Sequence, residues 1–137
     1  MKRKGRKVLI IISIVVVCLA AGMAAVYMGL VASVRNVEAA FQDVDTVDLG
    51  KVVNGVYNGK AGVFICSTDL DVTVKDHRIA DIAINRQMNG GGKYQADGML
   101  ERIIAAQSPD VDVVSGATLT SKVIMVAVHG ALTGGPK

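Results

Sequence analysis

An uncharged stretch near the N-terminus restricts what this chain can fold into more than any other feature. The sequence MKRKGRK, with five basic residues, leads into an apolar run from Val8 to Val34 that contains no charged side chain. About 20 apolar residues in a helix cross a bilayer, whereas the apolar part of a signal peptide is usually about 7 to 15 residues long. We therefore expect a retained transmembrane helix over residues 8–34, although Val31-Ala32-Ser33 resembles a weak cleavage site.

The basic tail predicts how the chain is oriented in the membrane. Lys and Arg are retained on the cytoplasmic side, so residues 1–7 are expected to be a cytoplasmic tail and the C-terminal part to be extracytoplasmic. Once the five basic residues of the tail are subtracted from the 15 in the chain, 10 remain against 12 acidic residues. This near-neutral remainder lacks the basic surface that nucleic acids require, so we expect a single-pass protein of the cell membrane without a nucleic-acid partner.

The rest of the chain is long enough for one modest domain. Helical spacing continues from Val34 through Val37, Phe41 and Val44, and residues 35–49 are expected to form a juxtamembrane connector. Residues 50–137 are then the extracytoplasmic domain. The two cysteines, Cys18 and Cys66, provide no disulfide framework, and the chain has no metal-ligand spacing, so no metal site is expected.

Three strands are predicted at the start of this domain, because apolar residues there alternate with polar ones. The buried face is predicted to hold Phe64, Cys66, Thr68, Leu70, Val72 and Val74. The segment KDHRI supplies a tight turn, since Asp and His tolerate a positive φ better than most residues. In the strand after this turn, the predicted alternation places Ala80, Ile82 and Ile84 on one face. These strands form an antiparallel β-meander.

Helices are predicted to follow the strands. A loop with Gly90, Gly91 and Gly92 leads into an amphipathic helix that begins near Met99 and ends at Pro109. The sequence VDVV, residues 111–114, predicts a short strand, and LTSKVIMVAVHGAL predicts a second helix that stops before Gly134. Strands followed by helices indicate an α+β domain in which two helices cover the apolar face of the sheet.

The segment DVVSGATLTSK, residues 112–122, concentrates hydroxyl groups at the start of the second helix. One Ser or Thr suffices to cap a helix, yet Ser115, Thr118, Thr120 and Ser121 lie within about one turn of the start, with Gly116 among them. Capping remains the simplest explanation. A helix start also favours a phosphate, because its backbone N–H groups are unpaired and carry a partial positive charge.

Two other chemistries agree poorly with the sequence. QMNGGGKY lacks the first glycine and the final hydroxyl of a phosphate-binding P-loop. A hydrolase triad would combine Ser115 with His77 or His129 and an aspartate, but Ser115 is not in the G-x-S-x-G turn of such enzymes. No catalytic residue is therefore assigned.

The same segment resembles the flavinylation sequence of FMN-binding domains, which occur in the C and G subunits of sodium-pumping NADH:quinone reductases and Rnf complexes. That pattern consists of Asp, two variable residues, Ser or Thr, Gly, Ala and Thr. Its fixed positions are matched here by Asp112, Ser115, Gly116, Ala117 and Thr118. VTVKDHRIADIAI, the glycine loop and the last helix also resemble the family in order and spacing.

The resemblance covers about residues 50–133 and implies a cofactor and a partner. In this family an exported flavin transferase uses Mg²⁺ and FAD to attach FMN, through a phosphodiester, to the last threonine of the motif. That threonine corresponds to Thr118. Asp112 and Ser115 to Ala117 would then be recognised by the transferase or shape the loop, and Thr120 and Ser121 would cap the helix or donate to the phosphate.

The resemblance also suggests a function and a cofactor pocket. We expect a membrane-anchored electron carrier that serves membrane or extracytoplasmic redox partners and is not an enzyme on its own. Gln87, Asn89 and Gly91 are predicted to line the flavin site, with Gln87 where close relatives often have a histidine. Because aromatic residues are few, the flavin ring is expected to pack on aliphatic or Met side chains, such as Met88 or Met99. The alternative is a membrane-anchored binding or assembly subunit with noncovalent flavin or none.

Overall fold

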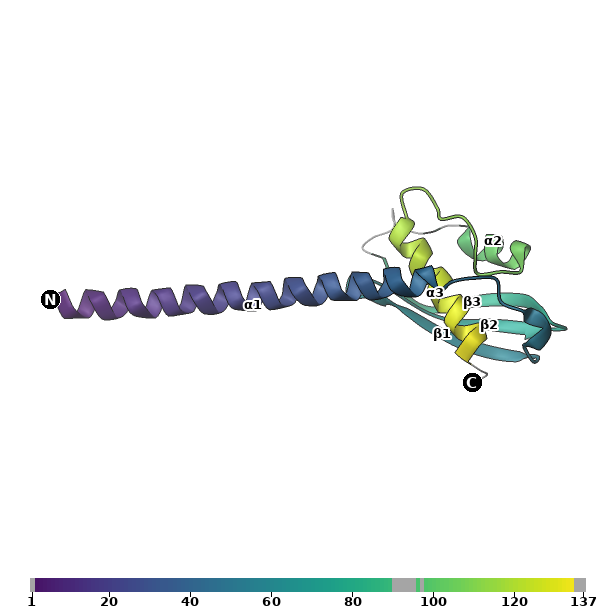
Figure 1. Ribbon diagram of the computed structural model, residues 1–137, viewed down its shortest axis with the longest axis horizontal. Helices are drawn as coiled ribbons and strands as arrows, with labels where there is room; N and C mark the ends of the chain where they lie inside the picture. Colours follow the sequence, from purple (N-terminus) through teal and green to yellow (C-terminus); the bar gives the residue numbers. More distant parts are fainter. Residues whose placement is uncertain (1, 90–95, 97, 135–137) are drawn as a thin grey trace. The chain divides into compact units, whose positions relative to one another are not determined.

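The computed structural model describes residues 2–89, 96 and 98–134. Contacts divide the chain into two units, Met1–Ala32 and Ser33–Lys137. The elements, labelled in Figure 1, are α1 (Lys2–Gln42), the 3-10 helix η1 (Leu49–Lys51), β1 (Gly55–Val63), β2 (Cys66–Lys75), β3 (Arg78–Met88), α2 (Met99–Ala106) and α3 (Thr118–Gly134). An antiparallel sheet followed by two helices confirms the α+β prediction.

Helix α1 contains the uncharged run. From Gly5 to Gln42 it is long and apolar enough to cross a membrane, by length and composition. Its side chains in the first unit, such as Leu9 and Met23, are exposed, as expected where lipid is the solvent. The helix does not break where the uncharged run ends at Val34, so the expected juxtamembrane helix is its continuation.

The sheet is a meander in the order β1-β2-β3. The β2–β3 turn confirms the prediction for KDHRI, because Asp76 and His77 have φ values of 52° and 58°. Cys66, Thr68, Leu70, Val72 and Val74 are all buried, which confirms one face of β2. Phe64 was wrongly placed on that face: it is 86% exposed, because it lies in the turn before β2.

The third strand departs from simple alternation. Its buried residues are Ile79 and Ile82, which lie three positions apart, whereas Ala80 is exposed. The pairing explains this shift, since Val74 is opposite Ile79 and Thr73 is opposite Asp81, which leaves Ala80 without a partner. Such a bulge shifts the alternation by one residue, so the prediction is wrong for Ala80. Ile82 and Ile84 do share a face, because they lie opposite the buried Val72 and Leu70.

Helix α3 packs across β1 and β2, and α2 contacts β3, which confirms that two helices cover the sheet. Gly59 of β1 permits the close approach of α3, because a Cβ at this position would lie 1.9 Å from the carbonyl oxygen of Ala127. Leu70, Met99 and Ile124 belong to the core between these layers. The predicted strand at residues 111–114 is wrong, since this segment extends from α2 to α3 without sheet pairing.

Candidate functional site

A tight turn precedes α3 and sets the position of its first residue. The N–H of Ala117 donates to the carbonyl of Val114 over 3.0 Å, which closes a four-residue turn. Gly116 occupies the third position with φ of 80°, a conformation that suits glycine. The carbonyl of Ala117 then accepts the first helical hydrogen bond, from the N–H of Ser121 over 2.9 Å. Ala117 is therefore the N-cap residue, and Thr118 is the first residue of the helix.

The start of α3 has no capping side chain on its N-cap residue. Alanine has no hydroxyl or carboxylate, so Ala117 cannot accept a hydrogen bond through its side chain. The N–H groups of Thr118, Leu119 and Thr120 precede the first i to i−4 bond. Among the described residues, no hydrogen bond to these three groups is found. The helix start therefore presents N–H groups that can donate hydrogen bonds to an anion.

Ser121 holds the turn against the helix. Its hydroxyl donates to the carbonyl of Ala117 over 2.9 Å and accepts from the N–H of Val114 over 3.0 Å. The side chain is fully buried. Ser121 therefore has a structural role, and its hydroxyl is already used in both directions.

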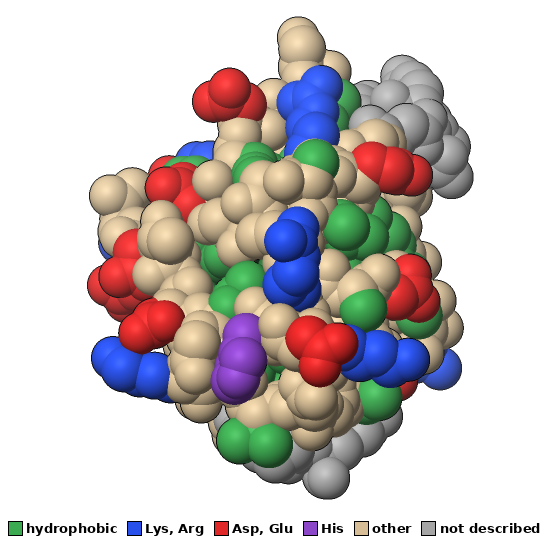
Figure 2. Space-filling view, turned by 90° about the vertical axis from the view of Figure 1, so that its right-hand side faces the viewer, with side chains coloured by type: hydrophobic (Ala, Val, Ile, Leu, Met, Phe, Trp, Pro, Cys, Tyr) green, Lys and Arg blue, Asp and Glu red, His purple; other side chains and the backbone are tan. Residues whose placement is uncertain are grey.

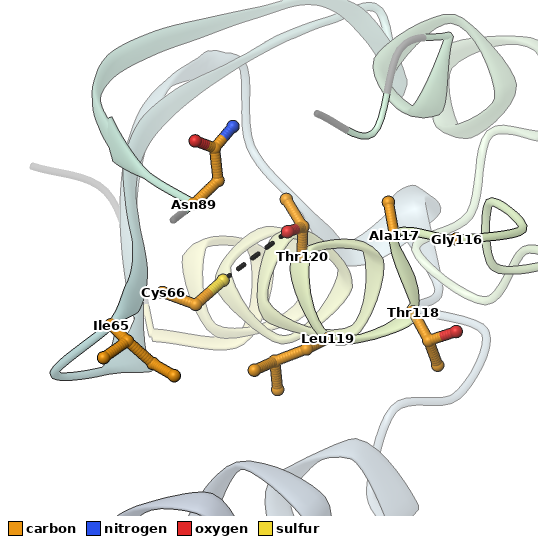
Figure 3. Close-up of a pocket in the computed structure, with 8 residues that line it drawn as sticks. All are labelled: Ile65, Cys66, Asn89, Gly116, Ala117, Thr118, Leu119 and Thr120. Atoms are coloured by element: carbon orange, nitrogen blue, oxygen red, sulfur yellow. Dashed lines mark hydrogen bonds between the residues drawn. The ribbon is translucent and has the colours of Figure 1, made fainter. Parts of the chain in front are cut away.

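A pocket of about 510 Å³ lies at this helix start. Its volume is within the range of about 300 to 1,000 Å³ that is common for cofactor sites. Figure 3 shows the lining residues, which come from the β1–β2 turn, the start of β2, the residue after β3, and the turn and first residues of α3. They are Ile65, Cys66, Asn89, Gly116, Ala117, Thr118, Leu119 and Thr120.

The two threonines of the pocket differ in exposure. Thr120 is buried, and its hydroxyl lies 3.6 Å from the sulfur of Cys66. Thr118 is exposed, and its hydroxyl points away from that pair in Figure 3. Thr118 therefore presents a hydroxyl to which another molecule has access.

The other predicted site residues are distributed around this pocket. Asn89 lines it, whereas Gln87 lines a separate hollow of about 310 Å³ beside α2. Ser115 and the side chain of Asp112 are exposed outside the pocket, and the carbonyl of Asp112 accepts from Arg102 over 3.3 Å. Gly91, like the rest of the glycine loop, lies outside the described residues.

Apolar side chains in the pocket were missed by the sequence analysis. Ile65 and Leu119 line it, whereas Met99 is buried in the core and Met88 is half exposed outside it. A signal for Ile65 existed, because a bulky apolar residue in a hairpin turn is unusual. The candidate histidines of a hydrolase contact other groups: His129 is 3.3 Å from Asp45, and His77 is 3.2 Å from the carbonyl of Leu49.

Comparison with known families identifies the domain. Residues 66–133 match the model of the FMN-binding domain, a range that begins at β2 and includes the pocket segments of β3 and α3. A search of curated proteins gives no match to the chain. Residues 66–133 therefore form an FMN-binding domain, and the chain is an FMN-binding domain protein.

Proposed function

We propose that this protein is a membrane-anchored electron-transfer module that carries FMN covalently, as a phosphodiester of Thr118. One observation carries the proposal: within the described part of the motif, Thr118 alone combines an exposed hydroxyl with a place in the pocket lining. Thr120 is buried against Cys66, and both hydrogen-bonding directions of Ser121 are used inside the turn. Ser115 is exposed but does not line the pocket.

The helix start suits the phosphate of FMN. A phosphodiester has one negative charge. The N–H groups of Thr118, Leu119 and Thr120, which have no hydrogen-bond acceptor within the described part of the chain, offer it donors at the positive end of the α3 dipole. Gly116 leaves room beside it, since nothing lies within 4 Å of a Cβ built at that position. Ile65 and Leu119 supply apolar surface for a ring. The residues present therefore fit this cofactor.

In the proposed attachment reaction, the FMN group is transferred from FAD to Thr118. The oxygen of Thr118 forms a bond to the phosphorus on the FMN side, the bond between the two phosphates breaks, and AMP leaves while the hydroxyl loses its proton. An exported, Mg²⁺-dependent flavin transferase is the partner that would catalyse this step. The exposed side chains of Asp112 and Ser115 are accessible for recognition by it.

Bound FMN supplies one- and two-electron redox chemistry, while the protein supplies position and electrostatics. The pocket fixes the cofactor beside β3 and α3, and the anchor keeps the domain at the membrane. This arrangement suits electron exchange with membrane or extracytoplasmic partners. The protein then acts as a carrier within a redox chain.

Substitution of the two pocket threonines tests the proposal. Thr118→Ala removes the proposed acceptor, whereas Thr120→Ala, two residues away, leaves it in place. After co-expression with a flavin transferase, wild type and Thr120→Ala should fluoresce on a denaturing gel, and Thr118→Ala should not. Peptide mass mapping should find the mass of FMN less one water on Thr118. Flavin on denatured Thr118→Ala protein would identify another acceptor, and unmodified wild type would favour the assembly-subunit alternative.

The orientation has its own test. A pair of reporters fused after Lys137, one active only in the cytoplasm and one active only outside it, should give activity for the second alone. Cytoplasmic activity would contradict the proposed localisation and the access of an exported transferase.

A further inference from the structure

The turns at the two ends of β2 have opposite character. The β1–β2 turn consists of Phe64 and Ile65, which are 86% and 50% exposed. The β2–β3 turn consists of Asp76 and His77, both exposed. Figure 2 looks at the end of the sheet with the β2–β3 turn, where acidic and basic side chains and a histidine lie among smaller hydrophobic areas. One end of the domain is therefore suited to water, and the other exposes apolar side chains.

The fold itself does not require apolar residues in the first turn. Val63 pairs with Cys66, so Phe64 and Ile65 are the two residues that connect the strands. Two-residue hairpin turns favour Asn, Asp and Gly, and exposed Phe and Ile there gain nothing from the core of the domain. An apolar tip of this kind indicates a surface that meets something apolar outside the domain.

The position of this turn along α1 indicates what the turn could contact outside the domain. Val63 and Cys66, which flank the turn, share a buried cluster with Val37 of α1. Val37 lies three residues beyond Val34, where the uncharged run ends, which corresponds to about 4.5 Å of helix rise. Arg35 is the first charged residue after that run. The two residues that flank the apolar turn therefore pack against α1 within about one helical turn of the point where its uncharged run ends.

We propose that Phe64 and Ile65 insert into the lipid interface of the membrane that α1 spans. Apolar side chains at such sites enter the boundary between headgroups and acyl chains, about 5 to 10 Å deep. Since the same chain is already anchored, the insertion is intramolecular and does not depend on protein concentration. This inference rests on the membrane anchoring in the proposed function.

Insertion would fix the cofactor pocket at the membrane surface. Ile65 lines the pocket with Thr118, so a turn held in the lipid interface keeps the opening of the pocket near the headgroups. A redox partner that moves within or along the membrane would then meet the cofactor without a large motion of the domain. The turn thus selects partners that approach from the membrane.

A single tryptophan tests this contact, because the chain contains none. Phe64→Trp and its matched control His77→Trp place the indole in opposite turns of β2. The full-length variants, expressed without flavin transferase so that flavin does not quench, are reconstituted into phosphatidylcholine vesicles with plain or brominated acyl chains. In both lipids the Phe64→Trp emission should lie to the blue of the His77→Trp emission. Brominated lipid should quench the Phe64→Trp emission and leave that of His77→Trp unchanged. Equal quenching of the two variants, or a blue shift without quenching by bromine, would overturn the inference.

Two further measurements separate this inference from the proposed function. Flotation of each variant with the vesicles after alkaline washing reports whether α1 is inserted, and flavin loading of separately prepared protein reports the covalent site. Quenching of Phe64→Trp without flavin loading would support the lipid contact and contradict the flavin proposal. Flotation and loading without quenching would overturn the lipid contact alone. Failure to float would overturn both the anchor and the contact.

Discussion

The two ends of the sheet differ in whether polar backbone groups find hydrogen-bond partners within the chain. At the β2–β3 turn, the N–H of Asp76 donates to Asn54 over 2.8 Å, and the backbone of Ile79 is bound by the side chain of Gln107. At the other end, α3 begins without a capping side chain and Phe64 is exposed. The first end is closed by hydrogen bonds within the chain. The second, open end leaves backbone donors and apolar surface exposed, and it is the end at which we propose that the cofactor binds.

The largest expected effect on stability is at the closed end. Gln107 accepts from the N–H of Ile79 over 2.7 Å and donates to its carbonyl over 3.0 Å, and it has φ of 54°. Gln107→Ala leaves two buried backbone groups unpaired and keeps the backbone strain, so it should lower the free energy of unfolding by about 3 kcal/mol. Urea denaturation measures this loss, and covalent flavin should not change.

Gln107→Gly is the matched control. It removes the same hydrogen bonds but tolerates a positive φ, so its loss should be smaller than that of Gln107→Ala by about 1 kcal/mol. Equal losses would assign the whole effect to hydrogen bonds. Reduced flavin loading in either variant would show that the two ends are not independent.

A buried hydroxyl at the open end should have the next largest effect. Ser121→Ala leaves the N–H of Val114 without its acceptor and should cost about 2 kcal/mol of unfolding free energy. The turn that presents Thr118 is then less well held, so covalent flavin should also decrease. Thr133→Ala removes the same kind of bond, to a carbonyl four residues earlier, from an exposed position. It should cost less than about 0.5 kcal/mol and leave loading unchanged.

At the closed end, the sequence predicted the turn but not the hydrogen bonds that hold it. The KDHRI turn was predictable, because Asp and His are among the few residues that tolerate a positive φ. The contact between Gln107 and Ile79 was not, since it joins residues 28 positions apart in the chain. The bulge at Ala80 was also hidden, because an unpaired residue leaves no mark on a pattern of alternating polarity.

At the open end, the motif correctly predicted the helix start, whereas the apolar residues around it led to two wrong predictions. The hydroxyl-rich segment placed Thr118 at the start of a helix, which α3 confirms. Phe64 was assigned to the core because apolar residues usually are buried, and residues 111–114 were assigned to a strand because they are rich in valine. Both rules describe folded interiors, and neither applies to an exposed turn or to a connection between two helices.

Closing the open end should increase stability and reduce function. Ala117→Ser supplies the hydroxyl that the N-cap lacks, so the flavin-free protein should gain about 0.5 to 1 kcal/mol of unfolding free energy. The new side chain competes with the phosphate for the N–H groups of α3, so covalent flavin should decrease. Urea denaturation and gel fluorescence measure the two effects. Higher stability with unchanged loading would show that these donors are not needed for attachment.

The smallest expected effect lies between the two ends, on the face of the sheet opposite α3. Hydrogen bonds from Asn58, over 2.8 Å, and from Lys60 keep the pKa of Asp69 below its usual value of 3.8. A lowered pKa in the folded state stabilises the protein above the unfolded pKa, and this contribution is lost as the pH falls through the folded value, below about pH 4. Asn58→Ala should raise the pKa of Asp69 towards 3.8, as measured by NMR titration of its carboxyl carbon. Because the side chain of Asp69 is 28% exposed and its charge is screened by solvent, the stability at neutral pH should change little through this charge, and flavin loading should not change. An unchanged pKa in Asn58→Ala would mean that Lys60 and Asn85 keep it low without Asn58. A loss of flavin would show that the middle of β1 also affects attachment.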